Sequence, residues 1–187
     1  METIPRREPN GYYTRLLGKR LEELLDSNFP GQYRVYYDHK LARPDKIMAH
    51  IGEECRENNL ARLDIAVISM ANTDHRLMIV SEIEEHKHTP KRFLGDLAAI
   101  MMSEKIKVDN RDYPLNDVTV VLGLISKRNG VTGQKARKFT SDFMTMIGES
   151  KSGKRGIDCV VVDADNGSVL IHQVENIIRS LLIKGSG

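Results

Sequence analysis

Two segments in the second half of the chain are apolar on both faces, and they constrain the fold more than any other feature. Residues 118–125 read VTVVLGLI and residues 157–162 read IDCVVV. A strand with apolar side chains on both sides is typical of the centre of a sheet that is covered on both faces. The sequence therefore predicts a central sheet flanked by helices.

The rest of the chain is predicted to form both helices and strands. Apolar residues at helical spacing predict helices over residues 13–25, 45–59, 90–101, 134–148 and 169–183. Further strands are predicted over residues 33–38, 63–70 and 77–84, the last two as a hairpin around residues 71–74. This order predicts an α/β fold with a mixed sheet, in a single domain that spans residues 1–187.

Composition narrows the class of protein. The 187 residues suit one domain, and the hydrophobic share of 40% and charged share of 29% are ordinary for a globular protein. No apolar run is long enough for a membrane span, and residues 1–13 do not resemble a secretion signal. Cys55 and Cys159 lack the spacing of metal ligands. We therefore predict a cytoplasmic protein with reduced thiols and no membrane partner.

Glu82 and Glu84 follow the apolar run 77–80 at a spacing of two. This is the side-chain period of a strand, so both carboxylates should project from one face, the face that carries Met78 and Val80. Two carboxylates side by side repel each other, and partial burial makes each charge costly. The pair therefore needs a proton, a cationic partner or a metal ion.

Asp64 on the predicted partner strand offers a third carboxylate. It shares a strand face with Ala66 and Ile68, and the hairpin pairing would bring it near Glu82 and Glu84. Three carboxylates on one face form an oxygen-rich site that suits a hard cation such as Mg²⁺ or Mn²⁺.

A different interpretation of the two glutamates is an exposed strand end that is paired with cations. Arg62, Lys87 and Lys91 are the candidates for that pairing. His86 and His88 alternate in the same segment, but without a further matched His or Cys they are better explained as surface loop residues than as ligands of a soft metal.

A strand with Asp, a returning strand with Glu-x-Glu and a helix directly after it resemble the PD-(D/E)XK nuclease superfamily. The resemblance covers residues 13–125 in the order helix, strand, hairpin, helix, strand, with one extra helix over 45–59 and a C-terminal extension over 134–184. It implies a restriction-endonuclease-like fold and metal-dependent hydrolysis of phosphodiester bonds, in DNA rather than RNA.

The resemblance also implies roles for individual residues. Asp64 and Glu82 would be metal ligands, together with the backbone carbonyl of Ile83. Glu84 stands where the family usually has lysine, which is the departure from its pattern. Lys91 on the following helix would supply the missing cation, with Lys87 as the nearer loop candidate.

The first predicted helix is a further source of acidic groups. In the family this helix often brings an acid to the site, so Glu22 or Glu23 would complete the metal shell. The competing interpretation is that each lies on a solvated helix face. The chemistry suits these residue types, because hydrolysis needs an acidified metal-bound water and neutralisation of charge in the transition state.

Positive charge is concentrated in residues 126–156, which hold eight Lys or Arg against two Asp or Glu, although the net charge of the chain is only +2. Three of the cations fall in the predicted first helical turn, where the macrodipole is already positive, so an anion would stabilise them. The candidates for nucleic-acid binding are Lys127, Arg128, Lys135, Arg137, Lys138, Lys154 and Arg155. Solvated loops are an equally good explanation.

Two functions from different classes follow. The first is a nuclease that acts on DNA with Mg²⁺ or Mn²⁺. The second is a nucleic-acid-binding or assembly module of the same fold that has lost catalysis through the change from lysine to Glu84. A small-molecule role would need a pocket that no motif announces. Relatives of this fold often dimerise, so a homodimer is expected, although no segment identifies its interface.

Overall fold

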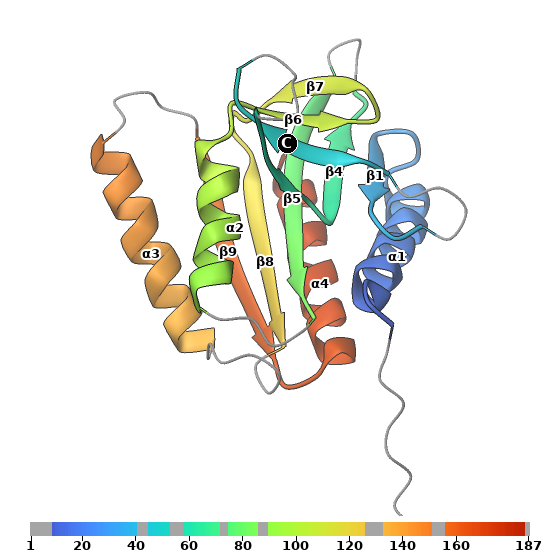
Figure 1. The fold of residues 1–187 in the computed structure, drawn as a ribbon. Helices are drawn as coiled ribbons and strands as arrows, with labels where there is room; N and C mark the ends of the chain where they lie inside the picture. The colour runs from blue at the N-terminus through green and yellow to red at the C-terminus, as the bar shows by residue number, and fades with distance from the viewer. Residues whose placement is uncertain are drawn as a thin grey trace, which may run out of the picture.

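The computed structural model describes residues 9–40, 45–52, 58–71, 75–85, 90–125, 133–150 and 156–185. Its elements in chain order are α1 (Tyr12–Asn28), β1 (Tyr33–Tyr37), β2 (Ile47–His50), β3 (Asn59–Arg62), β4 (Ile65–Ser69), β5 (Arg76–Glu84), α2 (Pro90–Met102), β6 (Lys105–Val108), β7 (Arg111–Pro114), β8 (Thr119–Ile125), α3 (Gly133–Ser150), β9 (Asp158–Ala164) and α4 (Gly167–Gly185) (Figure 1).

The main sheet has five strands in the order β1-β4-β5-β8-β9. β1, β4 and β5 are antiparallel neighbours, whereas β5, β8 and β9 run parallel. Parallel neighbours need a crossover connection, and α2 and α3 lie in the two crossovers. The predicted single α/β domain with a mixed sheet is confirmed.

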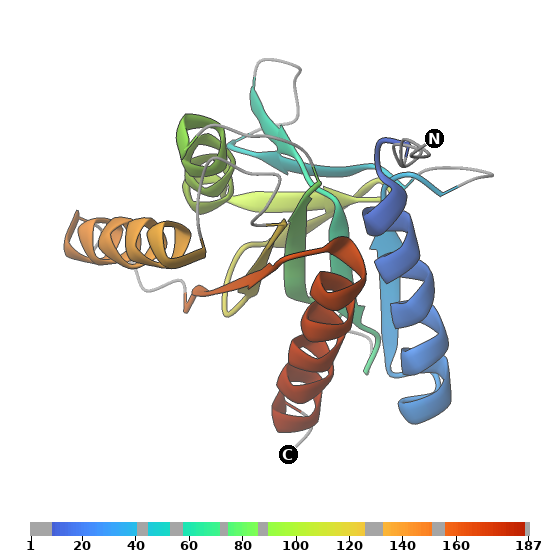
Figure 2. The same cartoon turned by 90° about the horizontal axis from the view of Figure 1, so that it is seen from below.

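Helices cover both faces of this sheet (Figure 2). On one face, α1 and α4 bury Leu17, Leu21 and Val174 against the sheet. On the other face, α2 buries Leu97 and Ile100. β8 lies inside the sheet as predicted, but β9 is an edge strand among the described residues. It is apolar on both sides because α3 and α4 pack on its two faces.

A second, antiparallel sheet has the order β3-β2-β6-β7. The predicted helix over 45–59 was therefore wrong, since β2 and β3 lie there and residues 53–57 are outside the described residues. Ile47 and Ile51 have helical spacing, but Ile47 and Ala49 face the core at strand spacing. The β6–β7 hairpin was not predicted. Its two-residue turn, Asp109 and Asn110 with φ of 46° and 68°, is typical of tight hairpins.

One irregularity changes which side chains share a face of β5. Val67 pairs with Ile79 and Ile68 pairs with Leu77, so Met78 is an extra residue in the strand. Val80 consequently shares the core on the α2 side with Leu77, while Met78 packs on the α1 side. The prediction that Met78 and Val80 lie on one face was wrong.

The remaining predicted helices and strands are confirmed, with ends that differ by no more than three residues. None of the described helices has both the length and the apolar character needed to cross a membrane. Cys159 is a free thiol among the described residues, and burial raises its pKa to about 12, so it is inert at neutral pH. Cys55 lies outside the described residues.

Candidate functional site

A cavity of about 450 Å³ lies at the carboxyl end of β5. The segments around it are the start of α1, the chain after β1, the start of β4 and the middle of α2. Its lining residues are Asn10, Gly11, Thr14, His39, Arg62, Asp64, Glu82, Ile83, Glu84, Glu85 and Asp96. Five of these are carboxylates, and we call the site the acidic cavity.

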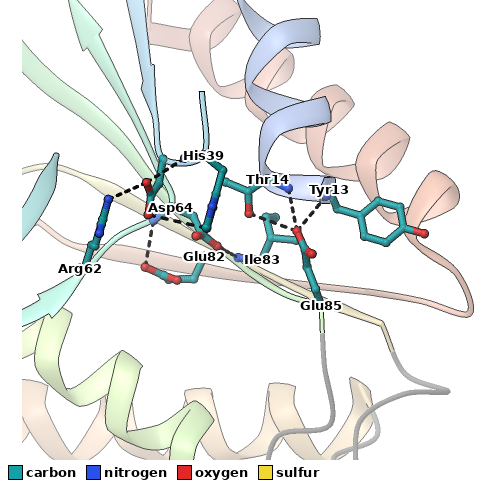
Figure 3. A network of polar contacts seen from close by, with 9 residues as sticks. Tyr13, Thr14, His39, Arg62, Asp64, Glu82, Ile83 and Glu85 are labelled. Carbon is teal, nitrogen blue, oxygen red and sulfur yellow. Dashed lines mark hydrogen bonds and ion pairs between the residues drawn. The ribbon is translucent and has the colours of Figure 1, made fainter. Parts of the chain in front are cut away.

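Asp64 and Glu82 are held together by two hydrogen bonds (Figure 3). The backbone N–H of Asp64 donates to Oε1 of Glu82 at 3.2 Å, and the backbone N–H of Ile83 donates to Oδ2 of Asp64 at 2.8 Å. The geometry follows from the register, because Ile65 pairs with Ser81, and Asp64 and Glu82 are the residues next to that pair on the two segments. The predicted meeting of these two side chains is found in the structure.

Burial dominates the electrostatics of the pair. It raises the pKa of Asp64 to about 6, with a further increase from Glu85, against the opposing effects of Ile83 N–H, His39 and the Thr14 hydroxyl. The pKa of Glu82 is raised well above its usual range, first by burial and then by the charges of Asp64, Asp96 and Glu84. Both carboxyls therefore hold a proton more readily than a solvated carboxyl does.

Glu84 lines the same cavity and is only 8% exposed. All three predicted carboxylates therefore line one cavity, but they do not converge into the predicted group of three metal ligands. The predicted cations cannot be placed in the same way. Lys91 belongs to the first turn of α2, but its side chain lies outside the described residues, as does the whole of Lys87.

Glu85 was not predicted to matter, and it connects two distant parts of the fold. The backbone N–H groups of Tyr13 and Thr14 donate to its Oε1 at 2.8 and 2.9 Å. Gly11, the residue at the N-cap of α1, has no side chain to do this. A carboxylate from the end of β5 therefore caps α1, where the helix dipole favours negative charge. No local signal exists, since 72 residues separate Glu85 from Tyr13.

Asp96 was also missed. It lies on α2 next to the buried Leu97, and its charge acts on Glu82 more strongly than that of Glu84. A signal was available, because a helix that directly follows β5 must return over the end of that strand. A carboxylate bordering the apolar face of such a helix is placed to reach the cavity.

Glu22 and Glu23 do not line the acidic cavity. Glu22 accepts a hydrogen bond from the Tyr37 hydroxyl at 3.0 Å and pairs with Lys40 at 3.0 Å. Lys40 also pairs with Asp45 at 3.0 Å, and we call these four residues the Lys40 cluster. Glu23 is exposed and lies 3.7 Å from Lys19. The helix does reach the acidic cavity, but through Thr14 and its N-terminal backbone.

The predicted basic strip on α3 is largely paired within the protein. Arg137 forms an ion pair with Asp163, and Lys138 pairs with Asp142 at 2.7 Å. Lys135 is exposed at the start of the helix. The other four candidates, Lys127, Arg128, Lys154 and Arg155, lie outside the described residues.

Arg62 lies at the edge of the cavity and pairs with Asp38 at 2.7 Å. The backbone N–H of His39 donates to the same Oδ1 of Asp38 at 2.8 Å. Across the described part of the chain, no Lys or Arg forms an ion pair with Asp64 or Glu82. The interpretation of a strand end neutralised by Arg62 therefore does not apply to this pair.

The cavity offers the carboxylate oxygens of five acidic side chains, and oxygen atoms are the ligands that hard divalent cations prefer. The arrangement is not a finished ligand cage: among the described residues, no three His, Cys, Asp or Glu side chains converge closely enough to hold a metal ion together. The structure thus provides oxygen ligands of the right kind without a closed shell of side chains.

No protein-family model, no curated protein and no solved structure matches this chain. The function is therefore inferred from the chemistry of the acidic cavity and the order of the elements around it.

Proposed function

We propose that the protein is a metal-dependent nuclease that hydrolyses phosphodiester bonds, in DNA rather than RNA, with Mg²⁺ or Mn²⁺. One observation carries the proposal: Asp64 and Glu82 are buried side by side without a Lys or Arg partner among the described residues. Two such carboxylates are costly to a fold that has no use for them. A divalent cation would remove that cost.

The arrangement of elements supports a restriction-endonuclease-like fold. The helix, strand, hairpin, helix, strand order is followed by α1, β1, β4, β5, α2 and β8. Asp64 directly precedes β4, and the Glu82-x-Glu84 motif lies on β5. On this interpretation the small sheet is made from two inserted hairpin segments. It covers the α2 side of the main sheet and leaves the acidic cavity at the carboxyl end of β5.

Asp64, Glu82 and the Ile83 carbonyl would hold the metal, which supplies an acidified water and neutralises charge on the phosphate. The chain's own residues do the rest. Glu84, buried in the same cavity, would accept the proton of the attacking water on its carboxylate. Arg62 at the cavity edge would orient the phosphate, and Lys91 would balance its charge.

The test is cleavage of supercoiled and linear duplex DNA in Mg²⁺ or Mn²⁺, with EDTA as the metal-free control. Asp64→Asn keeps an acceptor for the Ile83 N–H and should reduce the rate by about a hundredfold or more. Asp142→Asn, the same change at an exposed position on α3, should leave it unchanged. Equal cleavage by both variants would assign the activity to a contaminant or another site.

A second function has its own support. Glu84 replaces the usual lysine, and no three described side chains form a metal-binding group. Both observations favour a nucleic-acid-binding or assembly module that has lost catalysis. DNA binding in EDTA, together with no cleavage and no calorimetric binding of Mn²⁺, would select this alternative.

A further inference from the structure

A second cavity adjoins the acidic one on the outer side of the small sheet. Its volume is also about 450 Å³. Its lining residues are Lys46, Met48, Asn59, Arg62, Lys107 and Asn110. Three of the six are cations and none is a carboxylate, and we call this cavity the basic cleft. Arg62 lines both cavities, so the two sites lie next to each other at this side chain.

The strand register explains why these side chains gather. Met48 on β2 pairs with Arg62 on β3 and with Lys107 on β6, so the three stand in one row across the sheet. Lys46 precedes Met48 by two residues and extends the same face. The alternate residues Ile47 and Ala49 are fully buried in the core, so the row of cations faces outward.

Met48 on β2 separates Arg62 from Lys107 in this row, so the two cations are not direct cross-strand neighbours, and the three cations surround a cavity whose described lining has no carboxylate. The carboxylates nearest to this face form hydrogen bonds or ion pairs, some of them with residues outside the cleft. Asp38 pairs with Arg62, while Asp112, which is opposite Lys107 in the register, bonds His50 at 3.2 Å and lies 3.8 Å from Lys105. Asp109, in the adjoining hairpin turn, is a further carboxylate near this face, since its backbone N–H donates to the carbonyl of Lys46 at 3.5 Å.

We propose that the basic cleft binds the phosphate backbone of DNA and leads it past Arg62 into the acidic cavity, an inference that rests on the proposed nuclease function. Lys46 and Lys107 would contact phosphates that flank the bond to be cut, and the amides of Asn59 and Asn110 can donate to phosphate oxygens. The cleft positions the strand and takes no part in the chemistry.

The main electrostatic contact with DNA would then be made by the small sheet and not by α3. On α3 the exposed cations Arg137 and Lys138 already have carboxylate partners, which an incoming phosphate would have to displace. In the basic cleft no carboxylate belongs to the lining. Arg62 has Asp38 as a partner, but it also lines the acidic cavity, whereas no described residue of α3 does. A phosphate bound in the cleft would therefore lie next to the candidate site.

The experiment measures binding of a short fluorescein-labelled DNA duplex by anisotropy, in EDTA, over a range of salt concentrations. Lys46→Gln/Lys107→Gln is compared with Lys135→Gln/Lys138→Gln, which removes the same charge from α3. The cleft variant should bind about tenfold more weakly, and its slope of log affinity against log salt should shrink by about two. The α3 variant should match the parent. Thermal melting checks that both variants fold.

Unchanged affinity and slope in the cleft variant would overturn the inference, as would an equal or larger loss in the α3 variant or no binding by the parent. Cleavage is measured separately, with Mg²⁺, so the two proposals fail independently. DNA that binds through the cleft but is never cut contradicts only the nuclease function. DNA that is cut equally well by parent and cleft variant contradicts only the cleft.

Discussion

The acidic cavity and the Lys40 cluster lie on either side of one short stretch of chain. They differ in how their carboxylates are neutralised. Tyr37, the last residue of β1, belongs to the Lys40 cluster, whereas His39 lines the acidic cavity. In the cluster, Lys40 bridges Glu22 and Asp45 at 3.0 Å each. In the cavity, the carboxylates face one another.

The pKa values follow this difference. Burial alone would lower the pKa of Lys40, but hydrogen bonds to Asp45 and Glu22 outweigh it and raise the pKa. Burial and the neighbouring Glu22 raise the pKa of Tyr37 to about 12, so its hydroxyl keeps its proton at neutral pH and donates a hydrogen bond to Glu22. In the cavity, burial raises the pKa of Asp64 to about 6. The cluster is complete in itself, whereas the cavity needs a proton or cation from outside.

The largest expected effect is a pH-dependent cost at Asp64. Its pKa is about 6 in the fold and about 4 in the unfolded chain, so the folded state binds more protons between these values. The free energy of unfolding contributed by Asp64 therefore falls as pH rises from about 4 to about 6, by about 3 kcal/mol. In EDTA, Asp64→Asn should equal the parent near pH 4 and exceed it by that amount above pH 7.

Urea denaturation of both proteins across this pH range measures the difference directly. The difference curve is the proper quantity, because carboxylates that do not interact with Asp64 contribute equally to parent and variant. Its amplitude includes the effect on Glu82, whose pKa is raised in part by the charge of Asp64. A constant difference from pH 4 to pH 8 would show that Asp64 is solvated and that the comparison with the Lys40 cluster is mistaken.

An intermediate change in the free energy of unfolding is expected at Glu85, the cavity carboxylate that caps the N-terminus of α1. Glu85→Ala leaves the N–H groups of Tyr13 and Thr14 without their acceptor in a buried position. The free energy of unfolding should fall by about 2 kcal/mol. Glu23→Ala, on the exposed side of α1, is the matched control and should cost no more than about 0.5 kcal/mol. Equal losses in thermal melts would refute the capping role.

The smallest change in the free energy of unfolding is expected in the Lys40 cluster. Here the substitution should destabilise the protein, whereas Asp64→Asn should stabilise it. Lys40→Met keeps the length of the side chain but leaves Glu22 and Asp45 facing each other without a cation. The groups are partly exposed, so solvent screens the loss to about 1 kcal/mol at neutral pH. Lys40→Arg should recover most of it. A Lys40→Met variant as stable as the parent in urea would mean that solvent, and not Lys40, neutralises the cluster.

The parts of the fold that sequence could predict are those with strong local patterns. The helices α1 and α4 bury a continuous apolar stripe, and β8 is apolar throughout, so their types follow from composition and period. β2 has only four residues and depends on pairing with β6, more than fifty residues later. Such a strand is stabilised by a partner that no local window contains.

Some residues of the candidate site could also be predicted from local sequence, and others could not. Asp64 and Glu82 could be predicted to meet because one hairpin holds both. Asp96 could have been found from the position of its helix directly after β5, but Glu85 could not be assigned, since its role depends on how α1 docks against the end of β5. The displacement of Met78 to the other face was also beyond sequence, because a bulge depends on the register of the partner strand.

The cap that Glu85 places on α1 has a consequence for synthesis. The ribosome releases α1 well before residue 85 exists, so the newly made helix has no acceptor for the N–H groups of Tyr13 and Thr14. A helix of 17 residues without its cap or its packing partners is only marginally stable in water. The growing chain therefore gains the cap of its first helix only after Glu85 has been made.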